Sequence, residues 1–232
     1  MNHQSNVWWE HFDPFRKLTE DELRSIEKSM FMRVLKKGTI LRFPEMMNKY
    51  VYFLKEGIVK IAATDEEGNE IIKYLVKPGN LFGLMPLLDE QESPSDYAIA
   101  QEDSMVYFID VESLKHWMNV HQDLRTNVYK QIGTRIKKVE NRLLSMIFKE
   151  ARVRINNFVI ELAKEFGTIH DDYYTVKNFL THDDIAKLTA TSRQTVNSIL
   201  NELRDQQLIE YNNEVIRIPF NSRLLNQDKP ND

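Results

Sequence analysis

Five of the seven glycines in this chain of 232 residues lie between positions 38 and 83, and this clustering constrains the fold more than any other feature. Four of the seven prolines, at positions 44, 78, 86 and 94, fall in or beside the same region. Gly and Pro mark turns, and the segments between them here are short and apolar. The pattern predicts short strands at residues 39–43, 50–54, 57–63, 70–76, 96–100 and 105–109.

The spacing of these strands, about ten residues, is typical of a β-sandwich or jelly roll. Residues 65–69, with the sequence DEEGN, form a plausible hairpin tip between two of the strands. A helix is predicted before the strands, because Thr19 and Glu22 have the spacing of a capping box. Its apolar face is expected to contain Leu23, Ile26 and Met30.

After residue 110 the apolar residues recur at helical spacing. A short helix is predicted at 111–118, followed by a long one from about 122 to 148. The apolar stripe of the long helix packs either on the strands or on a second copy of the chain. Such a helix is roughly 40 Å long, more than a domain of this size covers, and a homodimer is the better interpretation. The predicted dimer residues are Leu124, Val128, Ile132, Ile136, Val139 and Leu143.

Nine basic residues lie between positions 125 and 154, against Glu140 and Glu150. A charge run of this kind is usually a solvated helix face. It could equally supply positive potential beside DNA, and the sequence leaves both interpretations open. The basic residues are Arg125, Lys130, Arg135, Lys137, Lys138, Arg142, Lys149, Arg152 and Arg154.

Composition excludes several chemistries. The chain has no cysteine, which rules out disulfides, thiolate-held iron–sulfur clusters and cysteine nucleophiles. None of the six histidines, at 3, 11, 116, 121, 170 and 182, lies among the predicted strands, so a metal site on the strands lacks imidazole ligands. Together with the lack of a visible nucleophile–base pair, this predicts a protein that is not an enzyme and that holds no metal or cofactor.

The chain shows no apolar run near the roughly 20 residues that a membrane span needs. Its N-terminal residues lack the basic-then-apolar order of a signal peptide. We therefore expect a cytoplasmic protein with no membrane partner. The net charge of −4 gives no hint of nucleic acid, so such a function must rest on local features.

Residues 181–220 carry the most specific pattern. Thr181 precedes two aspartates and a short apolar helix, and Ser192 precedes a longer one. Two apolar strands, 208–211 and 215–218, then flank an Asn-Asn turn. A short helix, a tight turn, a longer helix and a hairpin, in that order, predict a winged helix-turn-helix.

The longer helix should bury Val196, Ile199 and Leu200 and turn polar residues outward. Arg, Gln and Asn pair bidentately with base edges, and hydroxyls bind phosphate or bases. The alternative is an ordinary polar helix face. The predicted DNA-binding residues are Thr181, Ser192, Arg193, Gln194, Thr195, Asn197 and Ser198.

Three short sequence motifs are similar to those of a known protein family. They are YFLKEGIVK at 52–60, PGNLFG at 78–83, and DIA at 184–186 leading to TSRQTV at 191–196. In these three motifs the chain resembles the cyclic-AMP-receptor and fumarate-nitrate-regulator (Crp–Fnr) superfamily of bacterial transcription regulators. The resemblance implies an α+β protein in three parts. These are a cyclic-nucleotide-binding-like β-roll, or double-stranded jelly roll, at 1–120, a dimerisation helix at 121–148 and a winged helix-turn-helix at 149–232.

The resemblance further implies a homodimeric regulator that binds a near-palindromic operator in double-stranded DNA through a recognition helix at 192–206, with RNA polymerase as a partner. Arg193 matches the arginine that the family commonly places on a guanine. Gln194 stands where many members have glutamate and Ser198 where many have arginine, which puts the familiar operator sequence in doubt. Ala190 stands where glycine is common in the turn, which is tolerable if the φ of this residue stays negative.

The resemblance also bears on the effector. In members that bind cyclic nucleotides, a glutamate stands directly after the second glycine of the PGNLFG motif. About ten residues later, an arginine–serine pair binds the phosphate. Here Leu84 follows Gly83, and the pair becomes Pro94-Ser95. Without the arginine a buried phosphate loses its charge compensation, so cyclic AMP is not expected to bind in the usual mode.

The loop after the second glycine is strongly apolar. It either packs in the core between the roll and the long helix or lines a pocket for an unknown small-molecule effector, if one exists. The candidate pocket residues are Leu81, Phe82, Gly83, Leu84, Met85 and Ser95.

A second functional hypothesis stays open. The chain could be a ligand-binding or protein-interaction module whose winged helix contacts protein. Its net negative charge is compatible with this. Salt dependence distinguishes the two hypotheses, because DNA affinity falls linearly with the logarithm of salt concentration.

Overall fold

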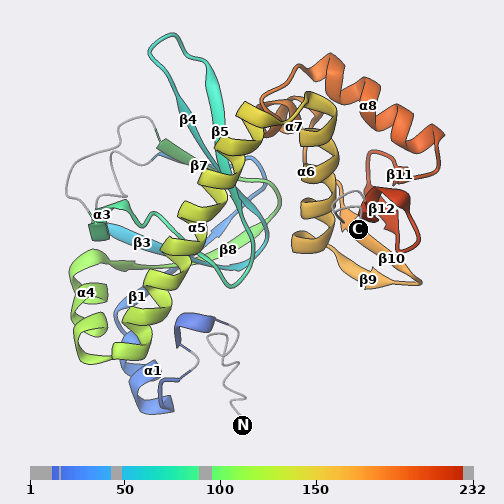
Figure 1. Cartoon of the computed structure of the whole chain (residues 1–232). Helices are drawn as coiled ribbons and strands as arrows, with labels where there is room; N and C mark the ends of the chain where they lie inside the picture. The colour runs from blue at the N-terminus through green and yellow to red at the C-terminus, as the bar shows by residue number, and fades with distance from the viewer. Residues whose placement is uncertain (1–11, 16, 43–48, 89–95, 227–232) are drawn as a thin grey trace. The chain divides into compact units, whose positions relative to one another are not determined.

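The computed structural model describes residues 12–15, 17–42, 49–88 and 96–226. The chain forms two compact units, Met1–Val139 and Glu140–Asp232 (Figure 1). The long helix α5 (Gln122–Phe148) has the predicted bounds, but the boundary between the units lies within it rather than at either end.

Unit 1 contains two antiparallel four-stranded sheets, with strand orders β1-β8-β3-β6 and β2-β7-β4-β5. The predicted jelly roll is thus confirmed, and each of the six predicted strands is present. Strands β1 and β6 were not predicted. The elements before α5 are η2 (Asp13–Phe15), α1 (Glu20–Glu27), β1 (Met30–Leu35), β2 (Ile40–Arg42), β3 (Tyr50–Glu56), β4 (Val59–Thr64), β5 (Glu70–Val76), β6 (Leu81–Phe82), α3 (Met85–Leu88), β7 (Asp96–Ala100), β8 (Ser104–Asp110) and α4 (Val111–Val120).

Strand β3 shows how the roll builds two cores. Neighbouring side chains of a strand point to opposite faces of the sheet. Tyr52 and Leu54 pack between the two sheets. Val51 and Phe53 pack on the other face, against residues of α1, α4 and the first half of α5.

The capping box predicted at Thr19 is present. The backbone N–H of Thr19 donates to Glu22 Oε2 over 2.7 Å, and the Thr19 hydroxyl accepts from the Glu22 N–H. Leu23 and Ile26 are buried as expected. Met30 was wrongly placed on this helix: α1 ends at Glu27, and Met30 begins β1.

The predicted hairpin tip between β4 and β5 is also present. The Asp65 carboxylate accepts from the backbone N–H groups of Glu67 and Asn69, over 3.0 and 2.8 Å. The Asn69 side-chain amide also donates to this carboxylate over 2.9 Å; this bond first, and then the backbone bonds, hold the pKa of Asp65 below its usual value. The tip therefore rests on a local side-chain network.

The predicted dimer residues near the start of α5 are buried, and those further along the helix are exposed. Leu124 and Val128 are fully buried in the core of unit 1, so their assignment to a dimer interface is wrong. Ile132 packs against the same core. Ile136 and Val139 are 54% and 55% exposed, and Leu143, in the second half of α5, is 57% exposed. No described helix, α5 included, is long and apolar enough to cross a membrane.

Unit 2 is a winged helix-turn-helix, as predicted. Its sheet has the strand order β11-β12-β10-β9. The β9–β10 hairpin was not predicted; Asp171 and Asp172 turn it with φ values of 46° and 63°. After α5 the elements are α6 (Ala151–Phe166), β9 (Thr168–His170), β10 (Tyr173–Lys177), α7 (His182–Thr189), α8 (Arg193–Asp205), β11 (Glu210–Tyr211), β12 (Val215–Pro219) and η3 (Arg223–Asn226).

Candidate nucleic-acid interface

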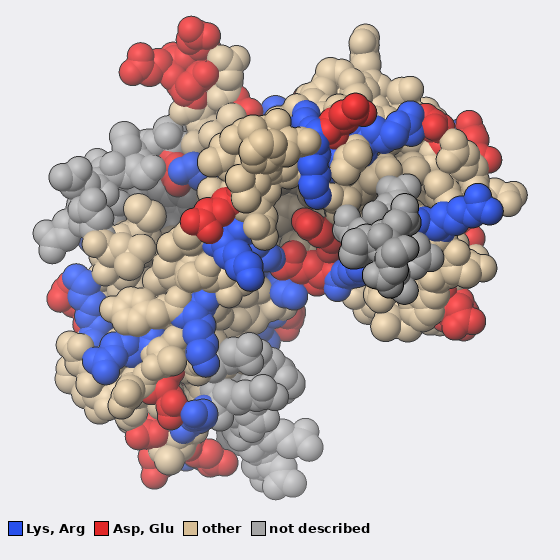
Figure 2. Space-filling model, viewed as in Figure 1, with Lys and Arg blue, Asp and Glu red and all other residues tan. Residues whose placement is uncertain are grey.

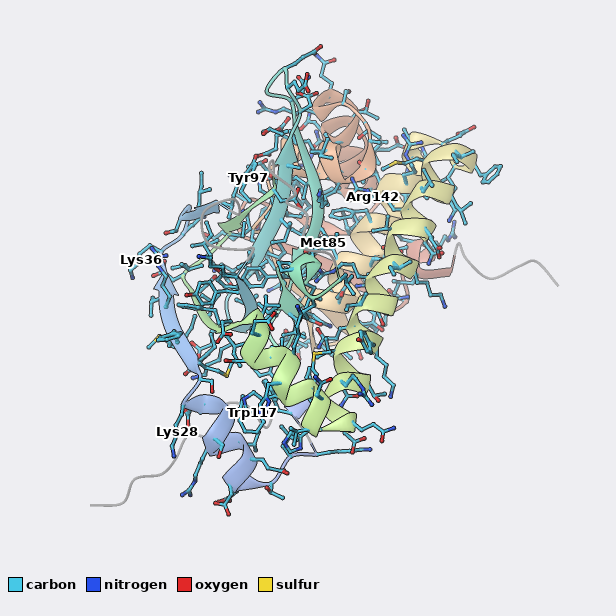
Figure 3. The ribbon with its side chains drawn as sticks, turned by 90° about the vertical axis from the view of Figure 1, so that its left-hand side faces the viewer. Lys28, Lys36, Met85, Tyr97, Trp117 and Arg142 are labelled. Atoms are coloured by element: carbon cyan, nitrogen blue, oxygen red, sulfur yellow. The ribbon has the colours of Figure 1, made fainter. Side chains whose placement is uncertain are left out.

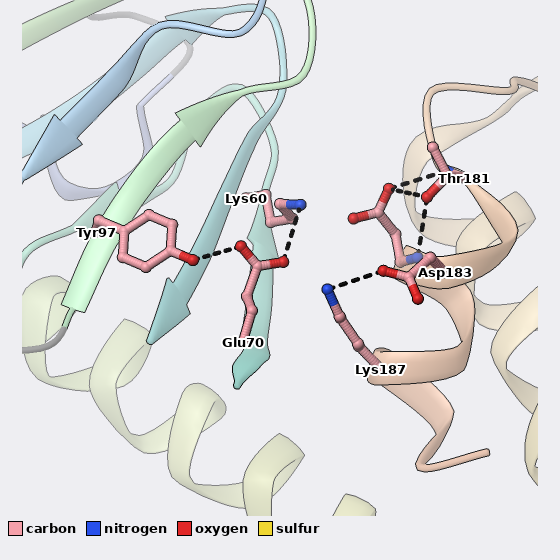
Figure 4. A network of polar contacts seen from close by, with 7 residues as sticks. Lys60, Glu70, Tyr97, Thr181, Asp183 and Lys187 are labelled. Carbon is pink, nitrogen blue, oxygen red and sulfur yellow. Dashed lines mark hydrogen bonds and ion pairs between the residues drawn. The ribbon is translucent and has the colours of Figure 1, made fainter. Parts of the chain in front are cut away.

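Helix α7 begins with a second capping box. The Thr181 hydroxyl donates to Asp184 Oδ2 over 2.7 Å and accepts from the Asp184 N–H over 3.1 Å (Figure 4). Asp184 is only 6% exposed. Lys187, one turn along α7, lies 2.8 Å from Asp183. Thr181 therefore orients α7 through its hydroxyl.

Helix α8 begins in a similar way. Ser192 Oγ accepts from the Thr195 N–H over 3.0 Å and shares a hydrogen bond of 2.8 Å with the Thr195 hydroxyl. Both residues were predicted to contact DNA, and in the protein alone both stabilise the start of α8.

The remaining predicted residues form one exposed group at the start of α8. Within the described part of the chain, none of them makes a hydrogen bond or ion pair through its side chain. The opposite side of α8 is buried, with Val196 and Leu200 fully inaccessible. The helix thus presents a rigid polar face, which we call the recognition face: Arg193, Gln194, Asn197 and Ser198.

His182 and Tyr211 lie beside the recognition face. His182 Nε2 is 2.6 Å from the Tyr211 hydroxyl, and the two rings stack with centroids 5.8 Å apart. Burial lowers the pKa of His182 below its ordinary value of 6.5, and the charge of Arg193 lowers it further. His182 is therefore neutral at pH 7, and Arg193 supplies the positive charge here.

The turn between α7 and α8 departs from expectation at Ala190. An alanine is tolerated in this turn without strain only if its φ is negative, but Ala190 has φ 51° and ψ 52°, the left-handed conformation. This lets the N–H groups of Ala190 and Thr191 both donate to the Ala186 carbonyl and end α7. A residue with a Cβ adopts this conformation at a cost of about 1–2 kcal/mol.

Two arginines hold the carbonyls at the end of α7. Arg154 donates to the carbonyls of Lys149, Thr189 and Ala190 over 2.7, 2.8 and 2.9 Å. Arg142 donates to the Lys187 carbonyl over 2.8 Å. The last carbonyls of a helix lack intrahelical partners, and cations there complement the helix dipole. These contacts fix the geometry of the turn despite the strain at Ala190.

Several of the basic residues at 125–154 bind other groups of the protein. Besides Arg142 and Arg154, Arg152 forms a bidentate pair with Glu202 over 2.9 and 2.6 Å. These arginines therefore have structural partners. On the face shown in Figure 2, basic and acidic side chains are interspersed, and α8 carries both signs.

Replacing Ala190 with glycine is expected to stabilise unit 2 by about 0.5–1 kcal/mol, because the left-handed strain of alanine exceeds the added chain entropy of glycine. Ala190→Val should destabilise it, since a β-branched residue tolerates this conformation poorly. Chemical denaturation followed by circular dichroism measures both. An unchanged midpoint for Ala190→Gly would show that the turn carries no strain.

The predicted effector pocket is mostly core. Leu81 and Phe82 are fully buried and Leu84 is 4% exposed. Leu81 and Leu84 pack in the core that includes α5, whereas Phe82 packs between the two sheets. Gly83 is half-buried, and Met85 on α3 is 53% exposed (Figure 3). Ser95 lies outside the described residues.

Helix α5 holds this loop by polar contacts that the sequence did not reveal. Gln131 Oε1 accepts from the Leu81 N–H over 3.0 Å. Arg135 donates to the Leu81 carbonyl over 2.7 Å and to the Tyr74 hydroxyl over 2.8 Å, with its guanidinium 4.0 Å from the Tyr74 ring centroid. Strand β6 is thereby fixed to α5 through both backbone groups of one residue.

The roll also contains a polar network on β4, β5 and β7. Lys60, 7% exposed, has its Nζ 3.6 Å from Glu70 Oε1, and the Tyr97 hydroxyl donates to the other carboxylate oxygen (Figure 4). Pairing allows a cation to be buried in this way. Across the described ranges, no three His, Asp or Glu side chains are grouped so as to hold a metal ion.

Two known families match the two ends of the chain. Residues 32–121 match the cyclic nucleotide-binding domain, and residues 153–226 match the Crp-like helix-turn-helix domain. The global nitrogen regulator of Synechococcus elongatus is 27% identical over 207 residues, which cover 89% of this chain and 93% of that protein. The cAMP-activated global transcriptional regulator CRP of Pasteurella multocida is 26% identical over 167 residues, covering 72% and 79%.

Solved structures share the fold. FixK2 from Bradyrhizobium japonicum superposes with a TM-score of 0.73 at 19% identity, covering 88% of this chain and 99% of that one. A CRP/FNR-family transcriptional regulator from Thermus thermophilus superposes with a TM-score of 0.68 at 22% identity, covering 84% and 97%. At these identities the likeness establishes the architecture alone.

Proposed function

The chain belongs to the Crp–Fnr superfamily of DNA-binding transcription regulators, and from this membership we propose that it acts as a homodimer on a near-palindromic DNA site. The members of this family are regulators, not enzymes. In our proposal the α8 helices of the two chains enter the major groove at points about one helical turn apart. The recognition face carries this proposal, because its polar side chains are exposed and its helix is anchored in a core.

The residue types on the recognition face suggest distinct roles. Arg193 suits the O6 and N7 acceptors of guanine, and Gln194 and Asn197 suit the N6 and N7 groups of adenine. Ser198 has a hydroxyl for a base or phosphate contact. Ser192 and Thr181 are assigned to positioning because their hydroxyls already cap α8 and α7, and Thr195 because its hydroxyl is bound to that of Ser192. The free N–H groups at the start of α8 add attraction for a phosphate.

The salt dependence of DNA binding distinguishes this proposal from the alternative in which the winged helix contacts protein. Fluorescence anisotropy is measured with the full chain on a selected duplex and on a random duplex of the same length. The logarithm of the binding constant should fall linearly with the logarithm of salt concentration on both, with tighter binding to the selected duplex. Failure to bind either duplex at low salt would favour the protein-interaction alternative.

The second half of α5 supports the dimer. Ile136, Val139, Leu143 and Ile147 recur at steps of three and four residues, which places them on one face. Each is more than half exposed, from 54% to 63%. Such a face lowers its free energy by packing against its own copy in a second chain. The proposed dimer contact therefore lies later on the helix than the sequence indicated.

Leu143→Ala is expected to weaken dimerisation by about 1 kcal/mol per chain, or more than tenfold in the dimer dissociation constant, because part of an apolar contact is lost on both sides. Sedimentation equilibrium measures this directly. Asn141→Ala, an exposed position on the opposite face of α5, is the matched control and should leave the constant unchanged. Equal constants for Leu143→Ala and the wild type would contradict the assigned face.

The proposal does not include cyclic AMP in the usual mode. Leu84 stands where nucleotide-binding members have glutamate, and its side chain packs in the core of unit 1. We place the regulator in the cytoplasm with DNA and RNA polymerase as its partners.

A further inference from the structure

Three arginines lie close together in the sequence where α5 ends and α6 begins. Arg142 is near the end of α5, and Arg152 and Arg154 are in the first turn of α6. All three belong to the basic run at 125–154, for which the sequence alone indicated either a solvated face or positive potential beside DNA. We call Arg142, Arg152 and Arg154 the junction arginines.

Two junction arginines bind the first helix and the turn of the helix-turn-helix. Arg142 donates to the Lys187 carbonyl of α7 over 2.8 Å. Arg154 donates to the carbonyls of Thr189 and Ala190, where α7 ends and the turn begins, over 2.8 and 2.9 Å. The end of α7 is therefore held from both α5 and α6.

The third junction arginine binds the recognition helix itself. Arg152 forms two hydrogen bonds, of 2.9 and 2.6 Å, with the two carboxylate oxygens of Glu202 on α8. A pair of parallel bonds between a guanidinium and a carboxylate fixes direction as well as distance. The first helix, the turn and the recognition helix are thus each bound from one short segment of the chain.

The same segment carries part of the proposed dimer contact. Leu143 directly follows Arg142, Ile147 lies one turn later, and both are more than half exposed. These two residues, the junction arginines and α8 all belong to unit 2. Arg154 also donates to the Lys149 carbonyl, between α5 and α6, over 2.7 Å. One guanidinium therefore joins the end of the dimer helix to the turn before the recognition helix.

Apolar packing holds the helices of unit 2 together but does not hold the end of α5. Helices α6, α7 and α8 each bury apolar side chains completely, for example Ile155, Ile185 and Leu200, and α6 packs against both of the others (Figure 1). Residues 140–148 of α5, all of which the structure describes, include no buried side chain. Polar contacts at the junction therefore set the direction in which α5 leaves the helix-turn-helix.

We propose that the junction arginines are positioning residues for DNA recognition, which hold the recognition helix in a fixed orientation to the dimer contact. This inference rests on the proposed function, because it requires a dimer that reads two half-sites. A dimer with fixed recognition helices accepts one spacing of the half-sites. One base pair more or less moves a half-site by about 3.4 Å along the duplex and rotates it by about 35°.

Three duplexes test the proposal: the selected site, and two versions of it with one base pair inserted or removed between the half-sites. Fluorescence anisotropy measures the affinity of the full chain for each. The wild type should bind the altered duplexes about tenfold more weakly than the selected one. In Arg154→Gln this ratio should fall to about threefold or less, because glutamine lacks the guanidinium fork that reaches three carbonyls.

A second variant and a control complete the test. Arg142→Gln, which removes the bond to the Lys187 carbonyl, should lower the ratio in the same direction and serves even if Arg154→Gln fails to fold. Lys164→Gln removes an exposed cation at the other end of α6 and should keep the wild-type ratio.

The ratio separates positioning from a merely structural role, which would lower the affinity for all three duplexes alike. A folded Arg154→Gln or Arg142→Gln variant that keeps the wild-type ratio would overturn the inference and leave the proposed function intact. A wild type that binds all three duplexes equally would contradict the proposed two-site dimer, and the inference with it.

Discussion

Replacing Gly57 with alanine is expected to destabilise unit 1 by about 3–5 kcal/mol, from backbone strain and steric overlap together. Gly57 has φ 89° where the chain passes from β3 to β4, that is, from one sheet of the roll to the other. An added Cβ would lie 2.2 Å from Ser104 Oγ and 2.7 Å from Ser104 Cα. Ser104 is 2% exposed and its hydroxyl donates to the Glu102 carbonyl, so it has little room to move.

Gly68→Ala separates the two contributions. Gly68 has a similar φ of 85°, but nothing lies within 4 Å of its added Cβ, so only the strain of about 1–2 kcal/mol is expected. Residues 140–232 contain no tryptophan and Trp117 lies on α4 of unit 1, so the fluorescence of Trp117 during urea denaturation follows that unit. Equal losses for the two variants would contradict the close approach of Gly57 to Ser104.

Arg193→Ala is expected to cost roughly 1–3 kcal/mol per half-site on the selected DNA and to relax specificity at one base pair of each half-site. Arg193 is the only arginine on the recognition face, and no described side chain competes for its guanidinium. Competition binding against duplexes that differ at single base pairs measures both effects.

Arg204→Ala is the control for losing one positive charge. Arg204 lies at the other end of α8, where its guanidinium is 3.2 Å from Asp205. This variant should keep the base preferences of the wild type. Should Arg193→Ala lose equal affinity for selected and random DNA, Arg193 would be a phosphate contact and not a base contact.

Much of the fold follows from local patterns. Turn residues between short apolar runs located six strands of the roll, and the helix caps at Thr19, Thr181 and Ser192 all form as predicted. Strand β1 was missed because Met30 continues the apolar spacing of α1. The β9–β10 hairpin was missed because its turn is Asp171-Asp172, without the glycine that usually accompanies a positive φ.

Features that depend on distant residues could not be predicted in this way. The apolar stripe of α5 indicates a buried face but does not indicate which surface covers it. In the structure, Leu124 and Val128 pack in the core of unit 1. Ala190 shows the same limit, since its left-handed conformation accompanies bonds from Arg154 on another helix. The pairing of Phe31 on β1 with Phe108 on β8 likewise joins residues that are 77 positions apart along the chain.

In the proposed function, two copies of α8 read one DNA site. Selection of bound sequences from a random duplex library by the full chain tests it most directly. We predict an enriched motif of two inverted half-sites whose centres are about one helical turn, or roughly 10 base pairs, apart. A library without enrichment, or a motif with one unpaired half-site, would show that the chain does not bind DNA as this dimer.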